Sequence, residues 1–213
     1  MKPNRFFAEL VGTFALVFIG AGVAAQNTAG ILGVALAFGL TAAVFVYLFG
    51  EISGTHINPS ITFALALDGD ISWVDAVFYW IAQFLGAVLA AAALFLVFVG
   101  AQNGLGQTTL ASGVNPLQGV LIEAIGTFFL VTSVFFAAVK GYAGKRAGFV
   151  IGLTLVFVIL FAGPLTGAGL NPARSLGPAL FTGTLNLYWI YLVGPLLGAA
   201  VAAGFYRLMT RKK

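Results

Sequence analysis

The chain of 213 residues is 61% hydrophobic and 8% charged, with a mean hydropathy of +1.05. A soluble domain of this length cannot bury so much apolar surface, so the composition places most of the chain in lipid. The absence of cysteine excludes disulfides, thiol nucleophiles and cysteine-based metal sites, and a formal charge of +4 without a basic domain gives little support to nucleic-acid binding.

Six apolar stretches follow one another along the chain, and most approach the roughly 20 residues that cross ~30 Å of hydrocarbon. We predict spans at Phe6–Ala25, Ile31–Phe49, Trp73–Val99, Leu117–Val139, Ala147–Phe161 and Leu187–Met209. The fifth is short, but it can continue toward Pro164. The first is longer than the usual ~7–15 apolar residues of a signal peptide, and its Glu9-x-x-Gly12-Thr13 pattern recurs inside the chain, which favours a membrane span.

The cations are distributed unevenly between the ends of these spans. Nine of the ten Lys and Arg residues fall on one side: Lys2, Arg5, Lys140, Lys145, Arg146, Arg207, Arg211, Lys212 and Lys213. By the positive-inside rule, both termini are expected in the cytoplasm. The tenth cation is Arg174, three residues after Asn171.

The chain also contains an internal repeat. Residues 53–59 (Ser-Gly-Thr-His-Ile-Asn-Pro) recur as residues 166–172 (Thr-Gly-Ala-Gly-Leu-Asn-Pro), and the two asparagines are 113 residues apart. Each half opens with Glu-x-x-Gly-Thr-Phe and closes with small residues four apart. We therefore expect one membrane domain over 1–213, with repeat halves at about 1–105 and 106–213. Three spans per half make the repeat inverted, which is typical of transport proteins.

Each Asn-Pro pair is expected to begin a helix. Asn58 and Asn171 are good N-cap residues, and Pro59 and Pro172 suit the first helical position, where a missing N–H costs nothing. The first helix can run to about Leu67, and ~10 residues at ~1.5 Å each cover only half a membrane. Two such half-helices entering from opposite faces would meet with their positive dipole ends near the bilayer centre.

The residues before each Asn-Pro pair would then be non-helical backbone at membrane depth, which is tolerated where it lines a watery cavity. Their carbonyls would form a ladder of acceptors, and we expect pore-lining backbone at Gly54, Thr55, His56, Ile57, Gly167, Gly169 and Leu170. This arrangement suits small neutral polar molecules, because a cation would face two positive helix ends and Arg174.

Glu9 and Glu123 lie early in their spans, where a carboxylate can carry protons or accept hydrogen bonds from buried backbone. Their symmetric placement favours bracing of the two unwound segments. His56 is the only histidine, so a metal site built from histidines is excluded, and a pore-facing role and a loop-bracing role both stay open.

With these motifs the chain resembles the aquaporins of the major intrinsic protein family. The resemblance covers nearly the whole chain and implies an all-α membrane protein with six transmembrane helices and two re-entrant half-helices. It rests on the Glu-x-x-Gly-Thr repeats, on Tyr188-Trp189, and on the two pore motifs Asn58, Pro59, Ser60 and Asn171, Pro172, Ala173. The family usually has Ala at the position of Ser60, and Ser is small enough to fit there.

The resemblance also implies a selectivity filter, which falls by motif spacing on Phe38, Ile159, Ala168 and Arg174. Water-selective members usually have His at the position of Ile159. Ile leaves a more apolar opening, similar to some archaeal-type members. Ser175 stands where glycerol channels usually carry Asp, and Phe38 where they tend to have Trp, so the water branch is favoured.

The function implied is a passive channel for water, and also for glycerol or other small neutral solutes, that excludes protons and ions. We expect no enzyme activity and no cofactor, and by resemblance a homotetramer in the cell membrane. Inverted repeats with broken helices also build proton-coupled transporters, in which Glu9 or Glu123 would carry protons. No chain of Asp, Glu and His residues crosses the predicted spans, so the channel is favoured.

Overall fold

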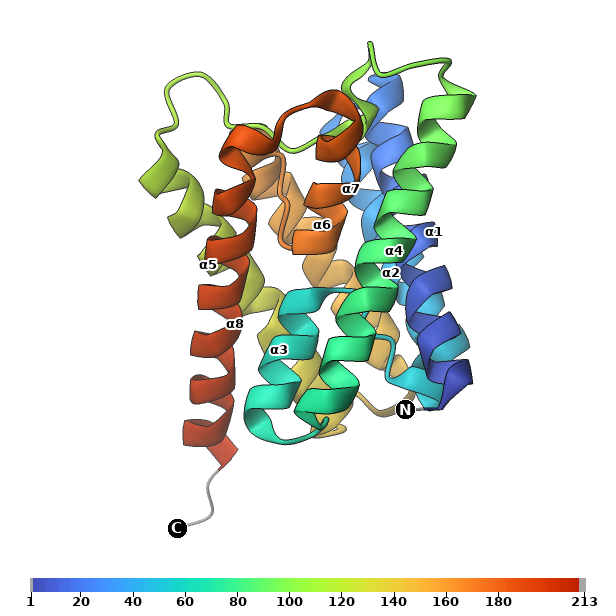
Figure 1. Cartoon of the computed structure of the whole chain (residues 1–213). Coiled ribbons are helices and arrows are strands. Elements are labelled where there is room, and N and C mark those ends of the chain that lie inside the picture. The colour runs from blue at the N-terminus through green and yellow to red at the C-terminus, as the bar shows by residue number, and fades with distance from the viewer. Residues whose placement is uncertain (1, 211–213) are drawn as a thin grey trace.

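The computed structural model describes residues 2–210, and all regular structure in that range is helical. Six long apolar helices make up the bundle (Figure 1). They are α1 (Pro3–Gln26), α2 (Gly30–Ser53), α4 (Trp73–Val97), α5 (Pro116–Val134), α6 (Ala147–Thr166) and α8 (Tyr188–Thr210). A 24-residue helix such as α1 is about 36 Å long, enough to cross the ~30 Å hydrocarbon core.

Two short helices complete the fold, α3 (Pro59–Asp68) and α7 (Pro172–Thr182). Asn58 and Asn171 stand in extended conformation before them. The Asn58 side-chain oxygen accepts the Ser60 N–H, and that of Asn171 accepts the N–H groups of Ala173 and Arg174. Gly69 and Gly183 end the two helices in the left-handed conformation. The expected pair of half-helices is therefore confirmed, and Figure 1 shows them approaching the middle of the bundle from opposite ends.

Two spans differ from their predicted form. Helix α6 runs past Phe161 and through Pro164 to Thr166, which lengthens the span that looked short in the sequence. The predicted span at Leu117–Val139 begins at Pro116, but its last turn is a π-helix, η2 (Phe135–Val139). Short 3-10 turns lie at Gly104–Gly106, Gly144–Arg146 and Leu185–Leu187.

Equivalent helices of the two halves pack in equivalent ways. Helix α1 contacts α2 and α4, α5 contacts α6 and α8, and α2 packs against α6 between the halves. Each half-helix packs on the last helix of the other half, α3 on α8 and α7 on α4. The crossings are close because glycines sit at them: a Cβ on Gly86 would lie 2.4 Å from the Leu10 carbonyl oxygen, and one on Gly198 would lie 2.1 Å from that of Ala124.

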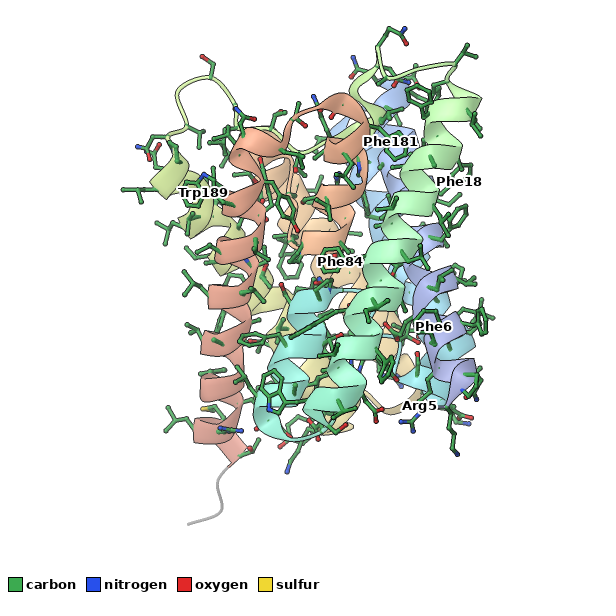
Figure 2. All side chains as sticks on the ribbon, in the orientation of Figure 1. Arg5, Phe6, Phe18, Phe84, Phe181 and Trp189 are labelled. Carbon is green, nitrogen blue, oxygen red and sulfur yellow. The ribbon has the colours of Figure 1, made fainter. Side chains whose placement is uncertain are left out.

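The outer surface is apolar along the long helices, with Leu96 and Leu117 more than three-quarters exposed, as expected for a surface that faces lipid. Helix α1 begins and α8 ends at the same end of the bundle, and the connection between α4 and α5 lies at the opposite end (Figure 1). Figure 2 shows Arg5 at the first end and Trp189 toward the other. We call these the inner and outer ends.

Candidate pore and its filter

The two Asn-Pro motifs meet at the centre of the molecule and hold each other. Asn58 Nδ2 donates to the Leu170 carbonyl at 2.9 Å, and Asn171 Nδ2 donates to the Ile57 carbonyl at 2.8 Å. Each amide thus binds the carbonyl that precedes the other motif. A side-chain amide has two N–H donors, and both asparagines line the central cavity, so each can offer its second donor to a solute.

The unwound segment before Asn58 is held from behind by Glu9. The backbone N–H groups of His56 and Ile57 donate to the Glu9 carboxylate at 2.9 and 2.7 Å. The Ser53 hydroxyl and the Gln83 amide donate to the same carboxylate at 2.7 and 2.8 Å. Thr55 and Ile57 have positive φ angles of 50° and 43°, so the carboxylate stabilises a backbone shape that non-glycine residues rarely adopt.

Glu123 does the same for the second segment. The backbone N–H groups of Gly169 and Leu170 donate to it at 2.9 and 2.6 Å, and the Thr166 hydroxyl donates at 2.6 Å. Both glutamates are fully buried. Because these N–H groups point at the carboxylates, the carbonyls of the segments are left to face other partners.

Two further side chains brace the segments, and sequence reasoning missed them. The Tyr79 hydroxyl donates to the Ser53 carbonyl at 2.7 Å, and the Tyr191 hydroxyl donates to the Thr166 carbonyl at 2.8 Å. A signal was present, because each tyrosine stands three residues before the small-residue series of its half, at Ala82 and at Gly194.

Three cavities form a path through the bundle, because neighbouring cavities share lining residues. An outer cavity of about 230 Å³ leads to a central one of about 60 Å³ and then to an inner one of about 960 Å³. A water molecule needs roughly 10–15 Å³ of such space, so the central cavity has room for about four to six waters. The central cavity is therefore the smallest of the three.

The central cavity has two unlike sides. One side is the polar strip of the two unwound segments and the two asparagines, from 54–58 and 168–171. The other is an apolar wall of long helices, lined by Leu16, Ala42, Val46, Leu130, Val134, Ala138, Ile151 and Leu155. A small polar molecule in this cavity would find hydrogen-bond partners only on the side of the polar strip.

The four residues of the expected filter form the boundary between the outer and central cavities. Phe38, Ile159, Ala168 and Arg174 line both cavities, and these two cavities share no other lining residue. They come from α2, α6, the second unwound segment and α7. The structure therefore brings together four residues that lie up to 136 positions apart in the sequence.

Arg174 is fixed at this boundary by its own contacts. It is only 3% exposed, its Nη1 donates to the Gly106 carbonyl at 2.8 Å, and its guanidinium carbon lies 4.9 Å from the centre of the Phe38 ring. Its Nε is buried and has no protein partner among the described residues. Gly106, in the connection between α4 and α5, was not singled out from the sequence.

His56 lies where the central and inner cavities join. Its side chain lines both cavities, its Nδ1 is 3.1 Å from the Thr62 hydroxyl, and its ring is 4.9 Å from that of Tyr79. It therefore faces the path and contacts the surrounding framework at once. The wide inner cavity beyond it includes Asp70, whose pKa is raised by partial burial and by the neighbouring charge of Asp68.

The remaining expected residues lie close to this path. Gly167 lines the outer cavity, and Pro59 and Pro172 occupy the first helical positions of α3 and α7. Ser60 and Ala173 are fully buried behind the motifs. The Ser60 hydroxyl has no partner among the described residues, and nothing in the structure explains a serine there.

The model of the major intrinsic protein family matches residues 2–206. The chain belongs to that family. It is 40% identical over 212 residues to aquaporin NIP1-1 of Zea mays, covering 97% of this chain and 74% of that protein. It is 39% identical over 216 residues to aquaporin TIP2-1 of Arabidopsis thaliana, covering 95% of this chain and 86% of that protein.

The fold has a match among solved structures. The X-ray structure of the aquaglyceroporin from Plasmodium falciparum superposes with a TM-score of 0.87, covering 95% of this chain and 94% of that one. The sequence identity is 23%, so this likeness concerns the fold. The expected fold class, six spans with two re-entrant half-helices, and the predicted family are confirmed.

Proposed function

We propose that this protein is a passive channel for water, and more slowly for glycerol or other small neutral solutes, that excludes protons and ions. The carrying observation is the narrow central cavity, which has a polar strip on one side and the filter residues at its outer boundary. Pore diameter, hydrogen-bonding groups and electrostatic barriers together determine selectivity in such pores.

The electrostatic argument rests on the centre and on the filter. The N-termini of α3 and α7 bring two positive dipole ends to the two asparagines, and Arg174 adds a full charge within the first turn of α7. No carboxylate lines the central cavity to replace a cation's hydration shell among the described residues. A cation therefore loses water without gaining a partner, whereas a neutral solute exchanges water hydrogen bonds for those of the strip.

The breadth of solutes follows from Ile159. Its apolar side chain lines the same boundary as Ala168 and Arg174, so a solute with a carbon skeleton meets less penalty than it would against a polar histidine. Phe38 still restricts the width. We therefore assign water as the fastest solute, with glycerol or ammonia slower.

The rival function, proton-coupled transport, has weaker support. Both glutamates are fully buried, hold backbone N–H groups, and are absent from the residues that line the three cavities. A proton carrier must release its proton to the path, and in this geometry neither carboxylate reaches it. Their assignment as braces of the unwound segments is part of the proposal.

The remaining assignments concern the protein's surroundings. We place it in the cell membrane. We expect both termini in the cytoplasm, because nine of the ten Lys and Arg residues fall on one side of the spans predicted from the sequence. By family resemblance we propose a homotetramer with one pore per chain, built from repeat halves at about 1–105 and 106–213. We assign no cofactor and no catalysis to the pore.

The deciding experiment is osmotic shrinkage of proteoliposomes followed by stopped-flow light scattering, with parallel current recordings. Water permeability well above that of empty liposomes, with no current, is expected. Permeability equal to that of empty liposomes, with folded protein confirmed, would reject the channel. Solute uptake that follows an imposed pH gradient would favour the transporter.

A further inference from the structure

A fourth cavity lies outside the pore. It is a groove of about 380 Å³ between the end of α5 and the start of α6, at the inner end of the bundle. It shares no lining residue with the three pore cavities. Its lining is Ser133, Phe136, Ala137, Tyr142, Ala143, Arg146 and Val150.

The π-helical turn η2 gives the groove its apolar floor. The Lys140 N–H donates to the Phe135 carbonyl at 2.7 Å, the longer spacing of a π-turn, and Phe135 stacks inward on Tyr206 with ring centres 4.4 Å apart. Phe136 is left facing the groove, with its ring centre 5.5 Å from that of Tyr206 and 5.9 Å from that of Tyr142. Aromatic neighbours on two sides therefore fix the floor.

The rim carries unpaired positive charge. Arg146 is exposed, and within residues 2–210 no acidic side chain pairs with it. No Asp or Glu lines the groove in the same range. Its neighbour Lys145 lines the inner pore cavity instead, in the company of Glu51 and Asp70. Arg146 is therefore the cation of this groove, and the adjacent residue serves a different surface.

We propose that this groove binds one anionic phospholipid, with the phosphate on Arg146 and an acyl chain along Phe136 and Val150. The groove lies where two spans meet the inner membrane boundary, and basic pockets between transmembrane helices on that side suit anionic headgroups. A free phosphate would satisfy the cation and leave the aromatic floor uncovered. The apolar lining therefore selects a ligand that carries hydrocarbon.

Two neighbouring substitutions, Arg146→Gln and Lys145→Gln, remove the same charge from different surfaces. The full-length channel in detergent is titrated with phosphatidylglycerol or phosphatidylcholine, and bound lipid is counted by native mass spectrometry. We expect one preferred phosphatidylglycerol per chain, with affinity lowered about fivefold by Arg146→Gln and little changed by Lys145→Gln. Equal losses in both variants would mean diffuse surface charge and would overturn the proposal.

A third variant tests the groove itself. Val150→Trp keeps every charge and fills the space, so it should also lower phosphatidylglycerol binding. Unchanged binding in this variant would place the lipid elsewhere and reject the site. Glycerophosphoglycerol, the headgroup without chains, should compete poorly, and equal competition would indicate a simple phosphate site. Circular dichroism and thermal unfolding in detergent, expected to be unchanged, confirm that all three variants fold.

Discussion

The two unwound segments of the molecule share one framework and carry different chemistry. In both halves a buried glutamate, a hydroxyl residue and a tyrosine hold the backbone, at Glu9, Ser53 and Tyr79 and again at Glu123, Thr166 and Tyr191. The residue three positions after the asparagine is Ile61 in the first half and Arg174 in the second, and both line the central cavity. The repeat thus supplies the scaffold, and we expect the departures from the repeat to determine the selectivity.

The glutamates also differ in what surrounds them. Glu9 accepts a hydrogen bond from the Gln83 amide, and the equivalent position in α8 is Pro195, which has no side-chain donor. Glu123 instead lies near the positive charge of Arg174. At the position of His56 the second half has Gly169, where a Cβ would lie 2.6 Å from Tyr191 and 2.7 Å from the Ser175 hydroxyl. The second segment therefore has no room for the side chain that the first one places at the inner junction.

The largest expected effect comes from removing the shared framework. Glu9→Leu or Glu123→Leu leaves at least two buried backbone N–H groups unpaired, at about 1–3 kcal/mol each. We expect either variant to lose most folded protein and water flux, as measured by thermal unfolding and proteoliposome shrinkage. A Glu9→Leu protein that folds and conducts water normally would contradict bracing by Glu9.

The second effect tests the main difference between the halves. Arg174→Val makes the filter position resemble Ile61 and should retain water flux while proton or cation leak rises about tenfold or more, because a buried positive charge beside the path is lost. Pyranine fluorescence in proteoliposomes measures the proton leak. Ile61→Val is the matched control and should leave it unchanged. Unaltered leak in Arg174→Val would remove Arg174 as the charge barrier.

A thiol can locate the narrow boundary. The native chain has no cysteine, so mercurials should not inhibit it. Ala168→Cys should make water flux mercury-sensitive and reversible by a reducing thiol, whereas Ser112→Cys on the exposed outer connection should be labelled without inhibition. Full flux through a mercury-labelled Ala168→Cys protein would place the constriction elsewhere.

A smaller effect concerns the breadth of solutes. Ile159→His introduces a polar wall at the outer boundary and should lower glycerol flux more than water flux, by about tenfold or less, as for other single pocket contacts. Ile159→Val keeps an apolar wall and should hold the ratio near that of the native protein. A glycerol-to-water ratio in Ile159→His that equals or exceeds the native ratio would exclude Ile159 as the determinant.

The smallest effect lies at the inner cavity. Burial and Asp68 raise the pKa of Asp70, so its charged form is disfavoured in the folded state. Asp70→Asn should therefore raise the unfolding temperature by about 1 °C near pH 7, since this site is well exposed to screening solvent. The gain should vanish at a pH below the ordinary pKa of an aspartate side chain, where the Asp70 carboxyl is neutral in both the folded and the unfolded chain. Equal gains at both pH values would assign the effect to something other than charge.

Much of this arrangement could be read from the sequence because the residues that form it are local or repeated. The Asn-Pro pairs begin both half-helices through local capping, and the end of the first was predicted to within one residue of Asp68. The filter came from family resemblance, and its four members are brought together by tertiary packing that no local pattern encodes.

Other features had no usable local signal. The Gly106 backbone carbonyl accepts a hydrogen bond from Arg174. Every residue has such a carbonyl, so the amino-acid type at position 106 does not reveal this contact. The π-turn at Phe135–Val139 reads as ordinary helix in an apolar run. Tyr79 and Tyr191 do stand at equivalent positions of the repeat. Their hydroxyl groups, however, donate to backbone carbonyls 26 and 25 residues away, and no local pattern predicts those partners.

The packing of each half-helix on the opposite half also bears on how the chain is made. Helix α3 is synthesised early, but it packs on α8, which is synthesised after the other described spans, and Asn58 donates to the carbonyl of Leu170. Of the long helices that α3 contacts, which are α4, α5 and α8, only α4 belongs to the same half. The first re-entrant segment therefore reaches its final contacts only when the second half has been inserted, so the central path cannot be completed before α8 is in place.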